Sequence, residues 1–210
     1  MATIKDTLIE IEKFQKEMEG LLKIGKVKQN KFAEDIMNFT TIYYFELLSH
    51  ASLELLKNKS LLPTDQMFKR YFSLFRQKMV LQEYIRWQNI GGLFMVWNIF
   101  EKIIRKLHKS IPNTSEKSLE DSYKDILKYS GFDSKQYSKI LEEFNAMRLT
   151  RNSLHQGGVY KFPQIRKYTL AGEIYTFEQG KEVRPIRLMT AINVMWSHYL
   201  YIIQSNKFCS

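Results

Sequence analysis

The sequence predicts an all-α protein, a helical bundle with a small β-hairpin before the C-terminal helix. Glycine and proline are scarce, with nine and four among 210 residues, and this favours helices over a sandwich or a barrel. Apolar side chains recur every three or four residues along most of the chain, which is the spacing of one helix face. Residues 168–177 differ, because apolar and polar side chains alternate around Gly172, as they do in a hairpin.

Three helices are expected in the N-terminal part of the chain. The first covers residues 3–22, and the second, which is rich in aromatic side chains, covers residues 31–58. The segment Ser-Leu-Leu-Pro-Thr-Asp at 60–65 should end the second helix, and its threonine or aspartate should cap the third. The third helix then runs to about Trp87. The many aromatic side chains here fit a hydrophobic core better than a base-stacking surface.

Two further helices are expected in the middle of the chain. Gly91 and Gly92 should open or kink the first of them, at about 90–109, which carries aromatic side chains on one face. A turn-rich loop follows. The second helix, at about 118–129, should be closed by Gly131, because glycine readily adopts the left-handed conformation that ends many helices.

The C-terminal part combines helices with the hairpin. Ser134 is expected to cap a helix that runs to about Gln156. The hairpin follows at about 166–180, with Gly180 at its far end, and the helical spacing resumes from about 187 to 204.

The chain has no internal repeat, low-complexity segment or clear linker. We divide it into an N-terminal helical layer, residues 1–89, and a helical core with the hairpin, residues 90–210. Its single cysteine, Cys209, allows no intrachain disulfide, which fits a reducing compartment.

No membrane segment is expected. The N-terminus carries charges every few residues, unlike a signal peptide. The most apolar window, Ile90 to Ile104, is interrupted by polar side chains and falls short of the roughly 20 apolar residues that span a bilayer. We therefore expect a cytoplasmic protein.

The charge balance favours a polyanionic partner. Lysine and arginine number 32 against 22 aspartates and glutamates, so the formal net charge is +10. A surplus of this size is typical of proteins that contact nucleic acid, and RNA is the first candidate. The alternative is that lysine-rich helices are simply well solvated.

The most informative segment is the end of the helix that closes near Gln156. Arg148, Arg151, Asn152 and His155 lie there, one turn apart or adjacent, and Arg151 falls near the middle of the apolar stripe. The stripe is formed by Ile140, Phe144, Met147 and Leu154. A guanidinium cannot lose its charge, and burying one without a partner costs on the order of several kcal/mol. Its partner should be a carboxylate, another subunit or a phosphate.

Arginine and histidine on one helix face could together cleave RNA without a metal. Imidazole titrates near neutral pH, and the planar guanidinium suits phosphate oxygens. His155 would help to deprotonate a 2′-hydroxyl or to protonate a leaving 5′-oxygen, and arginine would stabilise the charge on phosphorus. The competing interpretation is structural: Arg151 pairs with Glu101, while Asn152 and His155 cap the helix end.

Other chemistry has little support in the sequence. The four histidines are scattered without ligand spacing, so no metal is expected, and neither glycine pair has the context of a phosphate-binding loop, so no cofactor is expected. The carboxylates of Glu142 and Glu143 are interpreted as a solvated helix face.

Arg151-Asn152-Ser-Leu-His155, followed by glycines at the end of a helix in an all-α chain, resembles the signature of the HEPN superfamily. That signature is an arginine, usually followed by a polar residue, and a histidine after four to six intervening residues. Arg151 has the asparagine but only three intervening residues, whereas Arg148 has six and is followed by leucine. Either arginine can therefore be the one that acts with His155.

A second segment supports the resemblance, which covers residues 90–205. An aromatic–Glu–Arg pattern common on the other core helix of HEPN domains is matched by Phe94, Trp97, Phe100, Glu101 and Arg105. The run from Arg151 into the hairpin is also similar to uncharacterised bacterial proteins with a hairpin after such a helix.

The resemblance implies a small helical homodimer that acts on RNA as a metal-independent endoribonuclease of a bacterial toxin–antitoxin or antiphage system, with an antitoxin or defence subunit as a protein partner. Arg148, Arg151, Asn152 and His155 would form the site, and Glu101 and Arg105 would support it. Two rivals remain: a non-catalytic HEPN-like binding or sensor module, and a structural protein in which Arg151 pairs with Glu101.

Overall fold

The computed structural model describes residues 8, 9, 12–14, 16, 17, 29–57 and 74–209. The described chain is mostly helical with one two-stranded sheet before the C-terminal helices, so the predicted fold class is confirmed. Along the chain the elements are α2 (Gln29–Lys57), α4 (Leu74–Lys109), α5 (Leu119–Ser130), α6 (Ser134–His155), β1 (Arg166–Leu170), β2 (Glu173–Phe177), α7 (Leu188–Ile203) and α8 (Asn206–Cys209).

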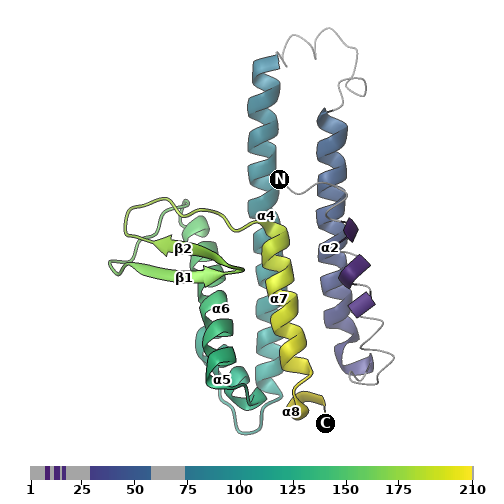
Figure 1. Ribbon diagram of the computed structural model, residues 1–210, viewed down its shortest axis with the longest axis vertical. Coiled ribbons are helices and arrows are strands. Elements are labelled where there is room, and N and C mark those ends of the chain that lie inside the picture. Colours follow the sequence, from purple (N-terminus) through teal and green to yellow (C-terminus); the bar gives the residue numbers. More distant parts are fainter. Residues whose placement is uncertain (1–7, 10–11, 15, 18–28, 58–73, 210) are drawn as a thin grey trace.

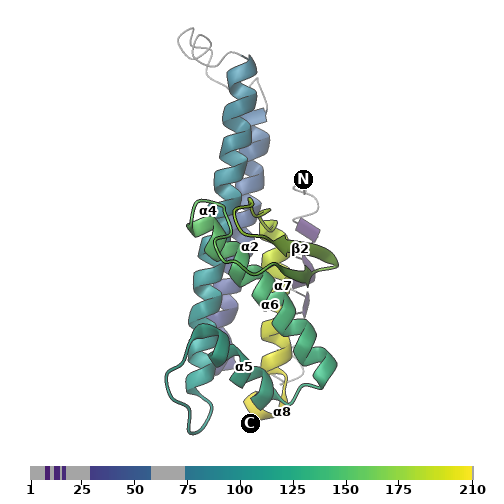
Figure 2. The same cartoon turned by 90° about the vertical axis from the view of Figure 1, so that its left-hand side faces the viewer.

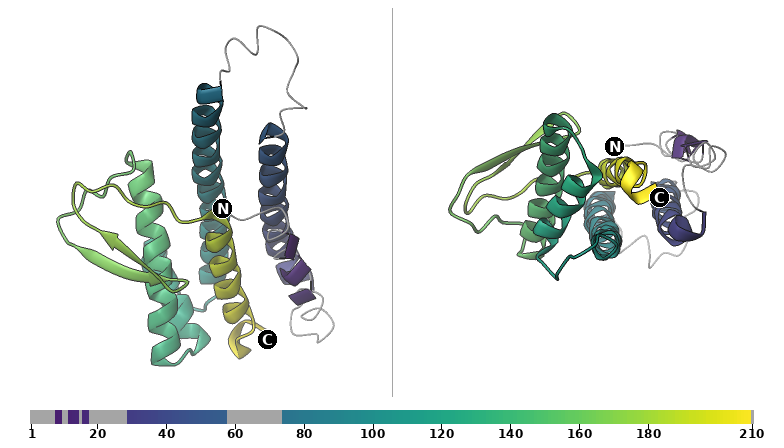
Figure 3. Two further views of the ribbon diagram at one scale, coloured as in Figure 1. Left: turned by 45° about the horizontal axis from the view of Figure 1, so that its top comes forward. Right: turned by 90° about the horizontal axis from the view of Figure 1, so that it is seen from below.

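The helices form a bundle with α7 near its centre (Figure 1). α2, α4 and α7 lie side by side, α5 and α6 cover another side of α4 and α7, and the hairpin lies against the outer side of α6 (Figure 3). Most side chains of α7 are buried, because other elements surround it. Tyr123 of α5 stacks on Phe144 of α6 with ring centroids 4.2 Å apart, and both side chains are fully buried.

The described N-terminal residues are helical and fall within the helix expected at 3–22. Phe14 is buried there against Trp196 of α7, with ring centroids 4.7 Å apart. The indole N–H of Trp196 donates to Glu17 at 3.0 Å. The expected break at 60–65, with its capping residues, lies outside the described residues.

A buried carboxylate joins three helices of the bundle. Asp35 of α2 accepts hydrogen bonds from Lys106 of α4 at 3.0 Å and from the hydroxyl of Tyr199 of α7 at 3.2 Å. Asp35 is only 2% exposed, so its charge requires these partners. They hold α2 against the other two helices.

The prediction of two helices separated near Gly91 is wrong, because α4 continues through both glycines from residue 74 to 109. Tertiary contacts explain the difference. Gly92 packs directly against the side chain of Leu188, at the start of α7, and a Cβ at residue 92 would collide with it. Asn89, one turn earlier, accepts from the backbone N–H of Leu188 at 2.9 Å, which satisfies one of the free donors of α7.

α4 also runs without a break across the boundary that the sequence suggests between residues 89 and 90. None of the helices in the described ranges is both long enough and apolar enough to cross a membrane.

The two adjacent glycines of α4 should respond oppositely to alanine. A Cβ at residue 91 meets nothing within 4 Å, so Gly91→Ala should stabilise the protein by up to about 1 kcal/mol through helix propensity. Gly92→Ala gains the same propensity but crowds the buried Leu188, and overpacking of this kind costs about 1–3 kcal/mol. Urea unfolding of the two variants measures the difference, and equal stabilisation of both would contradict the packing argument.

The helix caps match the predictions with one correction. Gly131 ends α5 with a φ of 76°, as expected. The residue that caps α6 is Asp133 and not Ser134, which is the first residue of the helix. The Asp133 carboxylate accepts from the backbone N–H groups of Lys135 and Gln136 at 2.9 and 2.8 Å. Aspartate and serine are about equally good caps, so composition alone could not decide between neighbours.

The hairpin forms as predicted and is attached to α6. Ala171 and Gly172 make a two-residue turn with φ values of 49° and 82°, and positive values at both positions suit the twist of a hairpin. The backbone N–H of Thr169 donates to Glu142 of α6 at 2.6 Å. The end of the hairpin is therefore held to α6 by a carboxylate of that helix.

Candidate functional site

The Arg151–His155 segment lines a cavity of about 590 Å³ between α6 and α4. The end of α6 lies beside the middle of α4 (Figure 2). α4 contributes Trp87, Ile90 and Phe94 to the wall, and α6 contributes Arg151, Leu154 and His155.

Two glycines end α6 immediately after the motif. The N–H of Gly158 donates to the carbonyl of Ser153 at 2.8 Å, and the N–H of Gly157 donates to Leu154 at 3.2 Å. This is a Schellman motif, which needs a left-handed residue after the helix, and both glycines have a φ between 85° and 88°. Because the helix stops here, no further turn covers His155, and both glycines line the cavity.

Arg151 is a half-buried cation with an incomplete set of partners. Its guanidinium lies over the ring of Phe94, 5.8 Å from the centroid, and Nη1 donates to Asn152 at 3.1 Å. Its buried Nε has no hydrogen-bond acceptor among the described residues, and none of their carboxylates lies within ion-pair distance. A buried donor without an acceptor costs about 1–3 kcal/mol, and the Arg151 side chain that carries it also lines the cavity.

His155 is exposed and uses the same aromatic ring as a support. Its imidazole meets the ring of Phe94 at right angles, with centroids 5.7 Å apart. Phe94 therefore contacts the Arg151 guanidinium and the His155 imidazole together and sets them on one wall of the cavity.

The structure places Arg148 apart from this pair. Arg148 forms an ion pair with Glu120 of α5 at 2.8 Å and a hydrogen bond to Asn145, and it does not line the cavity. The geometry thus favours Arg151 over Arg148 as the arginine that accompanies His155.

The expected pair between Arg151 and Glu101 is not formed. Glu101 accepts from Arg105 instead, one turn along α4, at 2.9 Å. The structural interpretation of Arg151 therefore loses the partner on which it depended.

The α4 wall contains residues that sequence reasoning did not assign to a site. Trp87, Ile90, Phe94 and Asn98 share one face of α4, at intervals of three and four residues. This spacing is visible in the sequence, but it is identical to the spacing of a buried stripe. Only the exposure of Trp87, 68%, shows that the face opens to solvent there.

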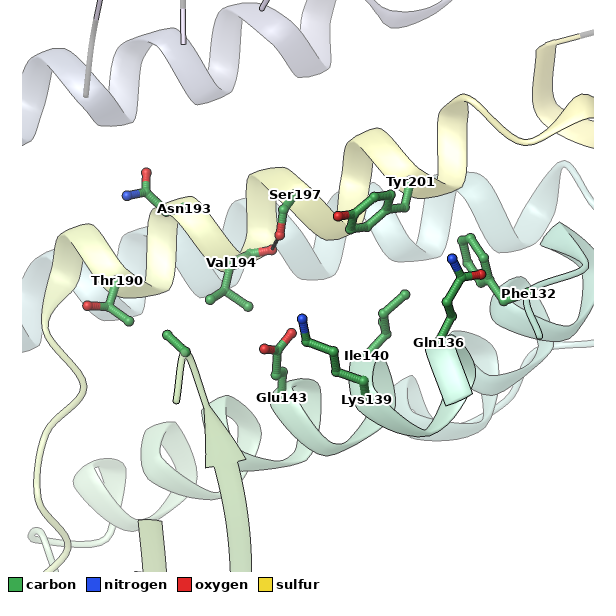
Figure 4. Close-up of a pocket in the computed structure, with 11 residues that line it drawn as sticks. Phe132, Gln136, Lys139, Ile140, Glu143, Thr190, Asn193, Val194, Ser197 and Tyr201 are labelled. Atoms are coloured by element: carbon green, nitrogen blue, oxygen red, sulfur yellow. Dashed lines mark hydrogen bonds between the residues drawn. The ribbon is translucent and has the colours of Figure 1, made fainter. Parts of the chain in front are cut away.

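A second cavity, of about 480 Å³, lies between α6 and α7 and reaches the hairpin turn. Lys139, Ile140 and Glu143 point from α6 toward Val194 and Ser197 of α7 (Figure 4).

Behind Glu143 lies a buried chain of hydrogen bonds. The Nε2 of His198 is 2.8 Å from the carboxylate of Glu143, and its Nδ1 is 2.9 Å from the hydroxyl of Tyr123. A carboxylate only accepts, so Nε2 carries the proton and Nδ1 accepts from Tyr123. The side chain of Glu143 is 12% exposed, so the interpretation of Glu142 and Glu143 as a solvated helix face is wrong for Glu143. Tyr123 and Glu143 lie 75 and 55 residues from His198, so no local pattern could indicate their association.

Burial sets the protonation states of this chain. It lowers the pKa of His198 below its ordinary value of 6.5 and raises the pKa of Tyr123, so both groups are neutral at neutral pH. Burial alone would raise the pKa of Glu143, but the hydrogen bond from His198, the charge of Lys139 and the N–H of Ala171 outweigh it. The pKa of Glu143 is therefore below 4.5.

Glu143 of the second cavity has a hydrogen-bond partner in His198, whereas the buried Nε of Arg151 in the first cavity has no acceptor among the described residues. The cavity beside Arg151 is therefore the candidate functional site. Within the described ranges no three His, Cys, Asp or Glu side chains are grouped as metal ligands would be. Comparison of the chain with protein-family models, curated proteins and solved structures gives no match.

Proposed function

We propose that the protein acts on RNA as a HEPN-like, metal-independent endoribonuclease of a bacterial defence or toxin–antitoxin system. The observation that carries the proposal is the arrangement of Arg151 and His155. A guanidinium that has no carboxylate partner among the described residues shares one ring and one cavity with an exposed imidazole. The net charge of +10 favours a polyanionic substrate.

The proposed reaction uses the RNA's own 2′-hydroxyl as the nucleophile. His155 takes the proton of that hydroxyl, whose oxygen then forms a bond to the adjacent phosphorus. The bond from phosphorus to the 5′-oxygen breaks, and the protonated His155 supplies the proton that the leaving oxygen takes, which returns the imidazole to its neutral state. Arg151 donates to the phosphate oxygens as charge develops on them, and Asn152 holds the guanidinium through Nη1. The products carry a 2′,3′-cyclic phosphate and a 5′-hydroxyl.

The test is cleavage of RNA by the purified protein in the presence of a chelator. We expect cleavage with cyclic phosphate ends and no cleavage of DNA of the same sequence, because DNA lacks the nucleophile. Cleavage of DNA, or loss of activity in chelator, would refute the mechanism.

The resemblance implies a homodimer and a protein partner, such as an antitoxin, and the proposal includes both. The apolar stripe of α6 does not itself call for a second subunit, because Ile140, Phe144 and Met147 are buried within the one chain. Association would instead place two Arg151–His155 cavities near each other, and light scattering measures it directly.

A non-catalytic HEPN-like binding module is the second candidate. The three residues between Arg151 and His155 favour it, because the family's spacing is four to six. A folded protein that binds RNA and leaves it intact in the cleavage assay would support this candidate over the endoribonuclease.

RNA affinity should depend on Arg151 more than on Arg148. Binding should weaken steeply with salt, because each phosphate contact releases condensed counterions. Arg151→Ala should weaken binding further. It should also reduce the slope of log affinity against log salt concentration by about 1, which corresponds to the loss of one phosphate contact. Arg148→Ala is the matched control, one turn earlier and already paired with Glu120, and should have the smaller effect. Fluorescence anisotropy at several salt concentrations measures both, and equal losses would contradict the assignment.

A further inference from the structure

An exposed indole stands on the wall of the Arg151 cavity. Trp87 is 68% exposed, whereas the other two tryptophans, Trp97 and Trp196, are 2% and 3% exposed. A tryptophan has a large apolar surface, and leaving it in water forfeits the free energy that burial of the ring would provide. A ligand that covers the ring would recover that free energy.

The groups beside Trp87 indicate the chemistry of that ligand. Arg86 and Asn98 of α4 line the same cavity as Trp87, with Arg151 and His155 across it. Among the described residues, the carboxylates within ion-pair distance of Arg86 are those of Glu83 at 4.0 Å and Glu182 at 3.8 Å, and contacts of this length hold its guanidinium weakly. Cations that follow a phosphate backbone next to an aromatic ring that stacks a base are the usual elements of single-strand binding.

The cavity suits one nucleotide rather than a duplex. A volume of about 590 Å³ falls in the range of pockets for small organic ligands. In an RNA helix each base is already stacked on both faces and its major groove is too deep and narrow for side chains, so no base face is available to an indole. An unpaired base has a free face.

We propose that this cavity binds one unpaired nucleobase against Trp87 and its phosphate at Arg151, so that Trp87 restricts the substrate to single-stranded RNA. The proposal rests on the RNA-directed function of the same site and adds the residue that selects the strand state. Trp87 contacts the base and takes no part in proton transfer.

The fluorescence of Trp87 provides the test. The probe is a short single-stranded oligoribonucleotide with 2′-O-methyl groups, which the proposed reaction cannot cleave. A stacked base should quench the emission of Trp87 and shield it from iodide, while Trp97 and Trp196 are too buried to respond. Trp87→Phe should remove the signal and keep most of the affinity, which a competition assay measures. Trp87→Ala should weaken binding about 5- to 150-fold, the range that corresponds to one stacked base.

Controls separate stacking from a general loss of binding. Phe162→Ala removes an aromatic side chain that is 49% exposed outside this cavity, and it should bind as the wild type does. The same oligonucleotide annealed to its complement should bind more weakly and leave Trp87 unquenched.

Four results would overturn the proposal: absence of binding, wild-type affinity in Trp87→Ala, a loss of affinity in Phe162→Ala as large as in Trp87→Ala, or equal quenching by the duplex. Quenching of Trp87 and weaker binding by Trp87→Ala, without any cleavage of unmodified RNA, would support the base site and refute the endoribonuclease. Failure of the base site can therefore be told apart from failure of the proposed cleavage.

Discussion

Replacement of His155 by alanine should slow RNA cleavage about a hundredfold or more, the usual scale for a positioned general acid or base. Histidine is the commonest general acid or base in enzymes, and no other described side chain of the cavity wall can replace it in proton transfer. His155→Gln keeps a polar side chain that cannot titrate, so it should be as slow as alanine. Initial rates with a labelled RNA in chelator measure both variants.

Stability should hardly change in these variants, because His155 is exposed and supports few contacts beyond Phe94. Equal unfolding midpoints would show that lost activity is a chemical defect. Arg151→Lys should also be inactive, since an ammonium keeps the charge but not the planar fork that holds two phosphate oxygens. A His155→Ala variant with wild-type rates would remove His155 from the mechanism.

The fold was predictable wherever a local pattern determines a local structure. The alternation around Gly172 predicted the hairpin, and Gly157 with Gly158 marked the end of α6. The break at Gly91 and Gly92 was predicted wrongly, because helix propensity is a weak preference and the contact between Gly92 and Leu188, which lies 96 positions along the chain from it, overrides it.

The candidate site was predictable only in part, for the same reason. Arg151 and His155 are four residues apart on one helix, so spacing alone placed them together. Trp87 reaches the site from another helix, and no periodicity distinguishes it from a core residue. Arg148 was also expected at the site, but its ion pair with Glu120 of α5 depends on how the helices pack.

Glu143→Ala should destabilise the protein by about 1–3 kcal/mol, because loss of the carboxylate leaves the buried Nε2–H of His198 without an acceptor. The neighbouring Glu142→Ala is the matched control. Glu142 also binds the hairpin, through the backbone N–H of Thr169, but at an exposed position where water can replace it, so its loss should cost less. Urea unfolding at neutral pH measures both variants, and equal losses would contradict the buried role of Glu143.

The same groups should make the stability of the wild type fall in acid. Because burial lowers the pKa of His198 in the folded protein, the unfolded chain binds more protons just below the ordinary value of 6.5, and the free energy of unfolding decreases as the pH falls from there. The contribution of Glu143 is present above its ordinary pKa of 4.5 and is lost only as the pH falls through its lower folded-state value.

His198→Gln should therefore reduce the slope of stability against pH just below pH 6.5 and leave the slope below pH 4.5 unchanged. Glu143→Gln should instead reduce the slope below pH 4.5. Glutamine at residue 143 can still accept from His198, so this variant tests the charge rather than the hydrogen bond. Unfolding midpoints across the acid range measure both slopes. An unchanged slope below pH 6.5 in His198→Gln would show that folding does not lower the pKa of the imidazole, and the neutral hydrogen-bonded chain from Tyr123 to Glu143 would then be wrong.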